Sequence, residues 1–170
     1  ALRRFAHEAA YINDRSALLV RALKTVRDHT TAQTSDILLL DGSAEYLSVS
    51  DPHGPQISEN DPAIVSLRAW SKPLDLHDVS GSRLQGELAF PMASRGRLVA
   101  ALVCGPKRDG EAYAPDETEA LAALARGVGG ALDVLDPRGE ESTAAALDEL
   151  VQLVRALPDA LAKRLFIEKQ

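Results

Sequence analysis

The chain has 170 residues, of which 45% are hydrophobic and 26% charged, a composition typical of a soluble globular domain with a sizeable core. Its formal net charge of −6 and pI near 5.2 provide no basic footprint, so we expect no nucleic-acid partner. One cysteine excludes an internal disulfide framework and a multi-cysteine metal site, and no apolar run approaches the roughly 20 residues of a membrane span.

The N-terminal part of the chain predicts helix followed by a β-hairpin. Apolar residues recur at steps of three and four over about residues 1–31, which indicates helix, and Asp14 in a polar patch is a suitable N-cap for a second start near residues 13–15. The apolar run 37–40, the turn residues Asp41 and Gly42, and the alternating segment 46–50 then indicate two paired strands.

The middle of the chain is more irregular. Asp61 suits a helix N-cap and Pro62 the first helical position, so a short helix is expected up to about residue 71. Residues 74–79 alternate and indicate a short strand, and residues 81–85 indicate a turn. Residues 86–92 read as another strand, which Pro91 restricts to an edge or a bulged position.

The C-terminal part predicts a buried strand over 97–104, a polar loop over 107–114 and a helix from Pro115 to about residue 135. Three glycines at 127, 129 and 130 each cost a helix about 1 kcal/mol relative to alanine, which indicates either close backbone packing or a bent or frayed helix. After residue 136, an apolar seam interrupted by Pro158 predicts two tail helices, about 142–157 and 158–167.

Residues 96–125 carry the most specific pattern, G-x-L-V-A-x-L-x-x-G-P-K-R-x-G-E-x-Y-x-P-x-E-x-x-x-L-x-x-L-A. It resembles the last strand, loop and C-terminal helix of GAF domains. The element order independently predicts an α+β class. The resemblance implies a GAF/PAS-like antiparallel sheet with the N- and C-terminal helices on one face, plus a C-terminal helical tail. We therefore expect a GAF domain over residues 1–136, including the N-terminal helix, and a helical tail over residues 137–170.

The resemblance also implies a small-molecule pocket between the sheet and the segment 51–85, which would face the strand 86–92. Its expected wall consists of Leu67, Trp70, Leu74, Leu76, Leu88, Phe90 and Met92. The alternative is that these side chains fill a second small core. The Asn-Lys-x-x-x-Phe-Asp-Glu run of cyclic-nucleotide-binding members, the chromophore cysteine of bilin-binding members and the cysteine set of free-methionine-sulfoxide-reductase members are absent, so any cofactor is unknown.

Candidate reactive side chains do not form a recognisable site. Cys104 is expected to be a small buried hydrophobe, and His7 lacks a second histidine four residues later. His53 and His77 are expected to be solvent-exposed, so we expect no metal site and no catalytic residue. Residues 105–110 indicate a turn with two solvated cations rather than a phosphate loop.

These observations favour a non-enzymatic sensor or regulatory module that binds a small molecule and signals through a homodimeric helix bundle. The bundle contacts are expected from Phe5, Ile12, Leu19, Leu124 and Val128, and an output domain or membrane segment would lie outside this chain. The alternatives are a ligand-free dimerisation scaffold, or a small redox or thiol enzyme of GAF-like fold. We expect a cytoplasmic location, either free or tethered to a membrane by a preceding segment.

Overall fold

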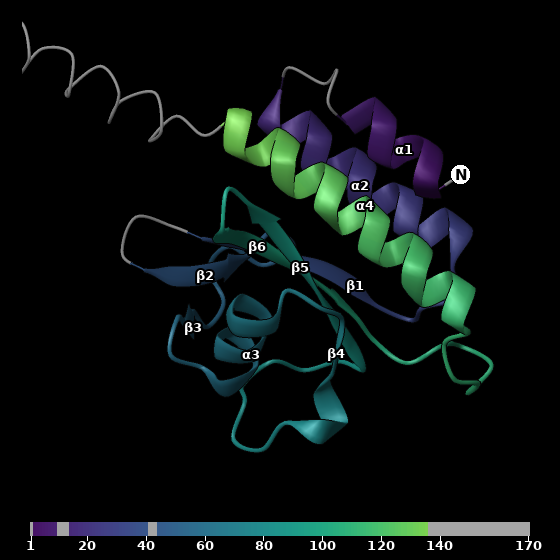
Figure 1. Cartoon of the computed structure of the whole chain (residues 1–170). Coiled ribbons are helices and arrows are strands. Elements are labelled where there is room, and N and C mark those ends of the chain that lie inside the picture. The colour runs from purple at the N-terminus through teal and green to yellow at the C-terminus, as the bar shows by residue number, and fades with distance from the viewer. Residues whose placement is uncertain (1, 10–13, 41–43, 136–170) are drawn as a thin grey trace, which may run out of the picture. The chain divides into compact units, whose positions relative to one another are not determined.

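The structure is a computed structural model that describes residues 2–9, 14–40 and 44–135 (Figure 1). The predicted tail 137–170, with its two helices, lies outside the described residues, as does Ile12. The division into a domain and a tail therefore stays a prediction.

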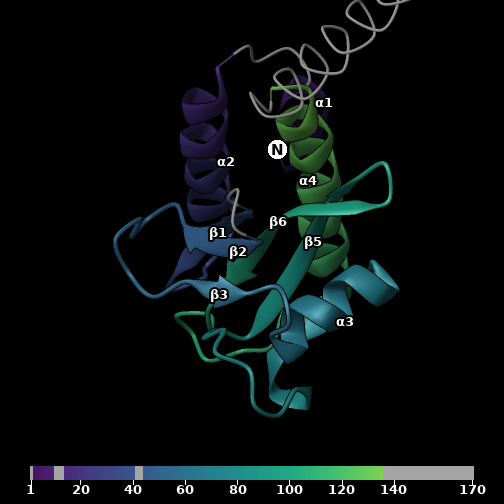
Figure 2. The same ribbon diagram turned by 90° about the vertical axis from the view of Figure 1, so that its left-hand side faces the viewer.

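Helices α1 (Leu2–Glu8), α2 (Arg15–His29) and α4 (Pro115–Val134) form one layer against the sheet (Figures 1 and 2). The predicted second helix start is confirmed, because the carboxylate of Asp14 accepts a hydrogen bond from the backbone N–H of Ser16 at 3.0 Å. The N- and C-terminal helices thus lie on one face of the sheet, as the sequence predicted.

The sheet has six strands in the order β3-β2-β1-β6-β5-β4, and each neighbouring pair is antiparallel. The strands are β1 (Ser35–Leu40), β2 (Glu45–Ser48), β3 (Ile57–Ser58), β4 (Leu74–Asp75), β5 (Leu88–Ser94) and β6 (Arg97–Cys104). The short helix α3 (Pro62–Trp70) lies on the face of the sheet opposite to the helix layer (Figures 1 and 2).

The alternation of side chains along the strands builds two cores, one on each face of the sheet. On β1, Ile37 packs into the core under α1, α2 and α4, whereas its neighbour Leu38 packs into the core under α3. On β6, Leu102 and Val103 divide in the same way. The central strands β1 and β6 therefore contact both layers of the domain.

One expected strand is corrected, and two further features of the sheet were not expected. Residues 76–78 form a 3-10 turn, η2 (Leu76–Asp78), rather than strand, because Asp75 caps the backbone N–H of His77. The two-residue strand β3 has no clear pattern in the sequence. Leu98 and Ala100 do not share a face, because β5 and β6 shift register there and leave Val99 as an extra residue on β6.

The close packing expected of the α4 glycines is confirmed at two of the three positions. A Cβ atom on Gly127 would lie 2.6 Å from the backbone oxygen of Ala6 in α1. A Cβ atom on Gly129 would lie 2.8 Å from the carbonyl carbon of Met92 in β5. Nothing lies within 4 Å of the same atom on Gly130. Glycine thus allows α4 to contact both α1 and β5 at backbone distance.

Candidate functional site

A cavity of about 360 Å³ opens on the α3 side of the sheet, at the ends of β1 and β2. We name it the sheet pocket. It is lined by Asp36, Leu38, Ser48, Asp51, Gly54, Pro55, Ile57, Arg83, Leu84, Gln85 and Val103. Its volume lies at the lower end of the range for small-molecule sites, which is about 300–1,000 Å³.

One wall of the sheet pocket is fixed by Asp36 at the start of β1. The Oδ1 atom of Asp36 accepts hydrogen bonds from the backbone N–H groups of Ile37 at 2.9 Å and Ser50 at 3.2 Å, and Oδ2 accepts one from the hydroxyl of Ser48. The same Ser48 oxygen accepts the backbone N–H of Asp51 at 3.0 Å. This Asp36 network ties the end of β2 and the following turn to the central strand.

The other wall is fixed by Asp61, which is only 7% exposed. Its Oδ1 atom caps α3 by accepting the N–H of Ala63 at 2.9 Å and also accepts the hydroxyl of Ser82 at 2.6 Å. Its Oδ2 atom accepts the backbone N–H of Arg83 at 2.7 Å. This Asp61 network therefore holds Ser82 and Arg83 against the first turn of α3, and Arg83 and Leu84 line the pocket.

The pocket combines an apolar interior with a charged rim. Leu38, Ile57, Leu84 and Val103 are buried and form the apolar part. The side chains of Asp51, Arg83 and Gln85 are exposed and line the opening. Such a site offers a hydrophobic surface together with a few polar groups that can orient a ligand.

None of the seven predicted ligand-wall residues lines this pocket. Leu88, Phe90 and Met92 lie on the opposite face of β5, where they pack against the helix layer, because Ala89 takes the alternate position toward α3. Trp70 ends α3 and is 72% exposed.

The remaining three predicted wall residues follow the alternative of a second core. Leu67 and Leu76 are buried in the α3 core, and Leu74 packs beside it. The predicted region, between the sheet and segment 51–85, does contain a cavity, but the side chains that line it are different. The sequence carried little signal for this lining, because Asp36 simply precedes the apolar run 37–40 and Arg83 and Gln85 lie in a segment expected to be a turn.

The predicted bundle contacts require a similar correction. Phe5, Leu19, Leu124 and Val128 are buried within the core between the helix layer and the sheet. They stabilise the domain itself and present no surface to a second copy. The helix layer instead exposes Val20 of α2 and Val134 of α4, which are 64% and 70% exposed.

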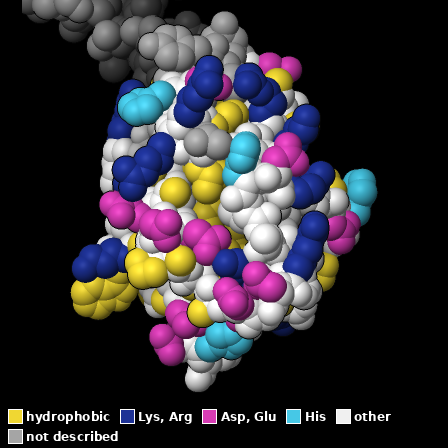
Figure 3. Space-filling model, turned by 90° about the vertical axis from the view of Figure 1, so that its right-hand side faces the viewer, with side chains coloured by type: hydrophobic (Ala, Val, Ile, Leu, Met, Phe, Trp, Pro, Cys, Tyr) yellow, Lys and Arg dark blue, Asp and Glu magenta, His cyan; other side chains and the backbone are white. Residues whose placement is uncertain are grey.

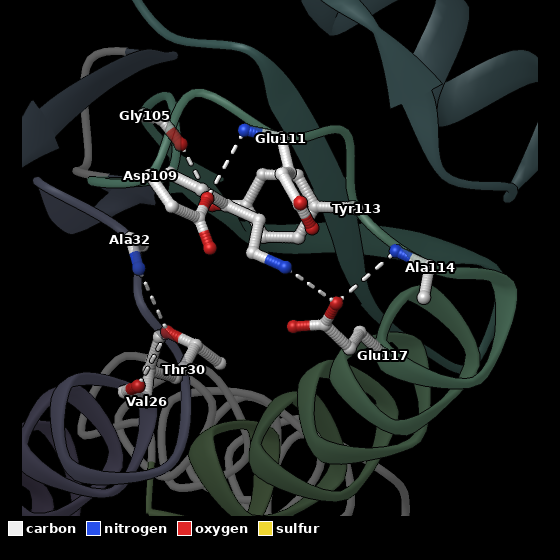
Figure 4. A network of polar contacts seen from close by, with 10 residues as sticks. Val26, Thr30, Ala32, Gly105, Asp109, Glu111, Tyr113, Ala114 and Glu117 are labelled. Carbon is white, nitrogen blue, oxygen red and sulfur yellow. Dashed lines mark hydrogen bonds and ion pairs between the residues drawn. The ribbon is translucent and has the colours of Figure 1, made fainter.

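A second polar network joins the loop after β6 to α4 (Figure 4). Lys107 is buried, contrary to the expectation of a solvated cation, and its Nζ atom lies 2.8 Å from Oε1 of Glu117. The same oxygen accepts the backbone N–H of Ala114 at 3.1 Å, and the hydroxyl of Tyr113 donates to the carbonyl of Gly105 at 2.6 Å. The hydrogen bond to Glu117 raises the pKa of Lys107, and burial raises that of Tyr113.

The expected burial of Cys104 is confirmed. Its side chain is fully buried among apolar neighbours, and this burial raises the pKa of the thiol to about 12. The described histidines, including His53 and His77, are exposed. No three metal-ligating side chains gather within residues 2–9, 14–40 and 44–135.

The surface view shows how charged side chains and histidines are distributed on one face of the domain. On the face in Figure 3, basic and acidic side chains are interspersed, and the histidines lie apart from one another. Among the described helices, none is long and apolar enough to cross a membrane.

Comparison with solved structures identifies the architecture. The GAF domain of a phosphoenolpyruvate-protein phosphotransferase from Coxiella burnetii superposes with a TM-score of 0.63 at 15% identity, covering 83% of this chain and 94% of that one. The fold is GAF-like. A GAF domain/HD domain protein from Geobacter sulfurreducens gives a TM-score of 0.61 at 14% identity, covering 75% of this chain and 97% of that one.

An enzyme shares the same fold. Free methionine-R-sulfoxide reductase from Neisseria meningitidis, in complex with its substrate, gives a TM-score of 0.54 at 18% identity, covering 85% of this chain and 89% of that one. Models of known families give no match, and neither does a search of curated proteins. Identities this low show the fold alone, and proteins of this fold include a reductase, so the fold by itself assigns no function.

Proposed function

We propose that the protein is a non-enzymatic regulatory module that binds a small molecule in the sheet pocket and passes the binding event to its helix layer. The observation that carries the proposal is the preformed cavity of about 360 Å³, whose two walls are each fixed by a carboxylate-centred hydrogen-bond network. Preorganised walls reduce the ordering cost of binding.

The strand pattern supports a physical route from the pocket to the helices. Leu38 of β1 and Val103 of β6 line the pocket, whereas the adjacent Ile37 and Leu102 pack under the helix layer. A ligand that displaces β1 or β6 therefore changes the surface on which α2 and α4 rest. A ligand shifts the equilibrium between two arrangements of the helix layer only if it binds one arrangement more tightly than the other.

Native mass spectrometry of protein purified without added ligand is the first test. We expect an adduct of small mass in the wild-type protein. The adduct should be lost in Gln85→Trp, because the new indole fills the pocket opening. It should be retained in Gln33→Trp, which places the same side chain at an exposed position elsewhere. An adduct that both variants retain equally would contradict binding in the sheet pocket.

The proposal includes a homodimer in the cytoplasm, and its contact surface is the exposed part of the helix layer rather than the buried residues first expected. Val20 supports this placement because it is 64% exposed on α2. In the same mass spectra, Val20→Glu should shift the population toward monomer, whereas Val65→Glu on the exposed side of α3 should not. If Val20→Glu remains dimeric, the dimer contact does not lie on the exposed face of α2.

The absence of enzymatic activity is also part of the proposal. A thiol enzyme needs an accessible thiolate, whereas Cys104 is buried with a raised pKa. The expected result is no turnover of free methionine sulfoxide by the protein in the presence of a thiol reductant. Reduction of that substrate by the protein, lost on substitution of Cys104, would overturn the regulatory assignment.

A further inference from the structure

The rim of the sheet pocket holds one cation and one anion that the protein leaves available. Among the described residues, no hydrogen bond or ion pair engages the guanidinium of Arg83 or the carboxylate of Asp51. Their backbones are nevertheless fixed, since Asp61 accepts the N–H of Arg83 and Ser48 accepts that of Asp51. Two opposite charges thus stand at one cavity on anchored segments.

The third charged group of the pocket differs from these two. Asp36 already accepts three hydrogen bonds from Ile37, Ser48 and Ser50, so its carboxylate serves the wall. It still adds negative charge to the lining. A phosphorylated ligand would meet two carboxylates and a single arginine, which disfavours a dianion.

The cavity interior sets the remaining requirements. Leu38, Ile57, Leu84 and Val103 form an apolar surface that suits a hydrocarbon group. A volume of about 360 Å³ lies at the lower end of the range for small-molecule sites, so the ligand has to be small.

We infer that the sheet pocket takes a small zwitterion with an apolar substituent, of the class of the apolar free L-amino acids. Arg83 receives the carboxylate, Asp51 receives the ammonium group, and the apolar interior receives the side chain. Arginine is suited to this role because its guanidinium can donate two parallel hydrogen bonds to a carboxylate. This inference rests on the proposed function and adds the chemical class of the ligand.

The test is calorimetric titration of the full chain with the apolar L-amino acids, each compared with its amide and its N-acetyl derivative. The amide lacks the anionic group and the N-acetyl derivative lacks the cationic one. Loss of a charged hydrogen bond reduces affinity by about tenfold or more, so both derivatives should bind at least that much more weakly than the parent amino acid.

Two variants assign the charges to residues. Arg83→Gln should weaken the amino acid about tenfold or more without affecting its amide, and Asp51→Asn should weaken the amino acid without affecting its N-acetyl derivative. The exposed positions Arg108 and Asp28 provide matched controls, since Arg108→Gln and Asp28→Asn should change neither affinity.

Three results would overturn the inference: no apolar amino acid binds at millimolar concentration, the derivatives bind as well as the parent, or Arg83→Gln has no effect. The proposed function is judged separately by the mass-spectrometric adduct and its loss in Gln85→Trp. An adduct without amino-acid binding would overturn the zwitterion class and leave the regulatory module standing. The absence of both an adduct and amino-acid binding would overturn both.

Discussion

The backbone N–H of Arg83 donates to Oδ2 of Asp61 at 2.7 Å, and this bond joins a rim residue of the sheet pocket to the N-cap of α3. The same carboxylate binds Ala63 and Ser82. A helix cap at this position thus also shapes the sheet pocket, so the stability of the domain and the proposed binding depend on one side chain.

Asp61→Ala should lower the free energy of unfolding by about 2–4 kcal/mol, because it removes a helix cap and leaves one buried and two part-buried donors without their charged acceptor. Asp14→Ala provides the matched control, since Asp14 caps α2 through a single exposed hydrogen bond to Ser16 and should cost about 1 kcal/mol. Urea denaturation of both variants measures the difference. Equal losses would show that the bonds to Ser82 and Arg83 contribute little.

The glycines of α4 give a prediction of opposite sign at neighbouring positions. Gly130→Ala should stabilise the domain by up to about 1 kcal/mol, because the position is open and alanine favours helix. Gly129→Ala should destabilise it by about 1–3 kcal/mol, because the new Cβ would lie 2.8 Å from the backbone of Met92 in a well-packed core. Thermal or urea unfolding distinguishes the two, and stabilisation by Gly129→Ala would contradict the close approach of α4 to β5.

These two cases indicate what the sequence could and could not predict. The cap at Asp61 was predictable because it depends on local residue preferences, and the three glycines of α4 indicated close packing, with a bent or frayed helix as the alternative. The additional bonds from Asp61 to Ser82 and Arg83 were not predictable, because they join residues 21 and 22 positions apart in an irregular segment. Most of the helices and strands followed from hydrophobic periodicity and breaker residues, and the α+β class followed from their order, whereas the two-residue strand β3 and the turn η2 did not.

The assignment of side chains to faces of the sheet was harder to predict. Phe90 and Met92 were expected in the pocket, yet both faces of β5 are apolar, so alternation of hydrophobicity gave no signal for which face bears the ligand. The apolar stripes of the helices are similarly ambiguous, because a stripe containing Leu19 or Leu124 suits a dimer contact and a core within one domain equally well. The sheet and helix layer use those side chains within one domain.

Trp70 tests the placement of the predicted ligand-wall residues outside the sheet pocket. It is the one tryptophan of the chain and is 72% exposed. Its fluorescence should be quenched by iodide almost as efficiently as that of free indole, and Trp70→Ala should change the free energy of unfolding by no more than about 0.5 kcal/mol. Leu67→Ala on the buried side of the same helix should cost about 2–5 kcal/mol. Strong protection of Trp70 from iodide would restore it as a wall of a binding site.

The thiol of Cys104 should react slowly with iodoacetamide in the native protein and rapidly after denaturation in urea. Burial removes access, and it also raises the pKa from an ordinary 9.0 to about 12, so little thiolate forms near neutral pH. Because the pKa is raised in the folded state, the stability contributed by the neutral thiol is complete below pH 9 and is lost as the pH rises toward 12. Fast labelling of native protein would revive a thiol-based activity.

The contact between Lys107 and Glu117 predicts a pH-dependent effect of Glu117→Gln. Glutamine can still accept the backbone N–H of Ala114, so the substitution removes mainly the charge opposite the ammonium group of Lys107. Because the bond to Glu117 raises the pKa of Lys107 above 10.5, its stabilisation is complete below pH 10.5 and is lost as the pH rises through the raised value. Glu117→Gln should therefore lower the melting temperature at neutral pH, and the difference from wild type should shrink in alkali.

Glu119→Gln is the matched control for this measurement, because Glu119 lies two residues further along α4 and, among the described residues, forms only an exposed contact with Arg3 at 3.6 Å. Exposed ion pairs contribute little to stability, so its melting temperature should follow wild type across the pH range. If the two variants melt alike, or if the deficit of Glu117→Gln does not change with pH, the ion pair between Lys107 and Glu117 does not stabilise the junction between β6 and α4. A deficit confined to pH values below the raised pKa of Lys107 would assign the stabilisation to the charged pair itself, rather than to the cap that Gln retains at Ala114.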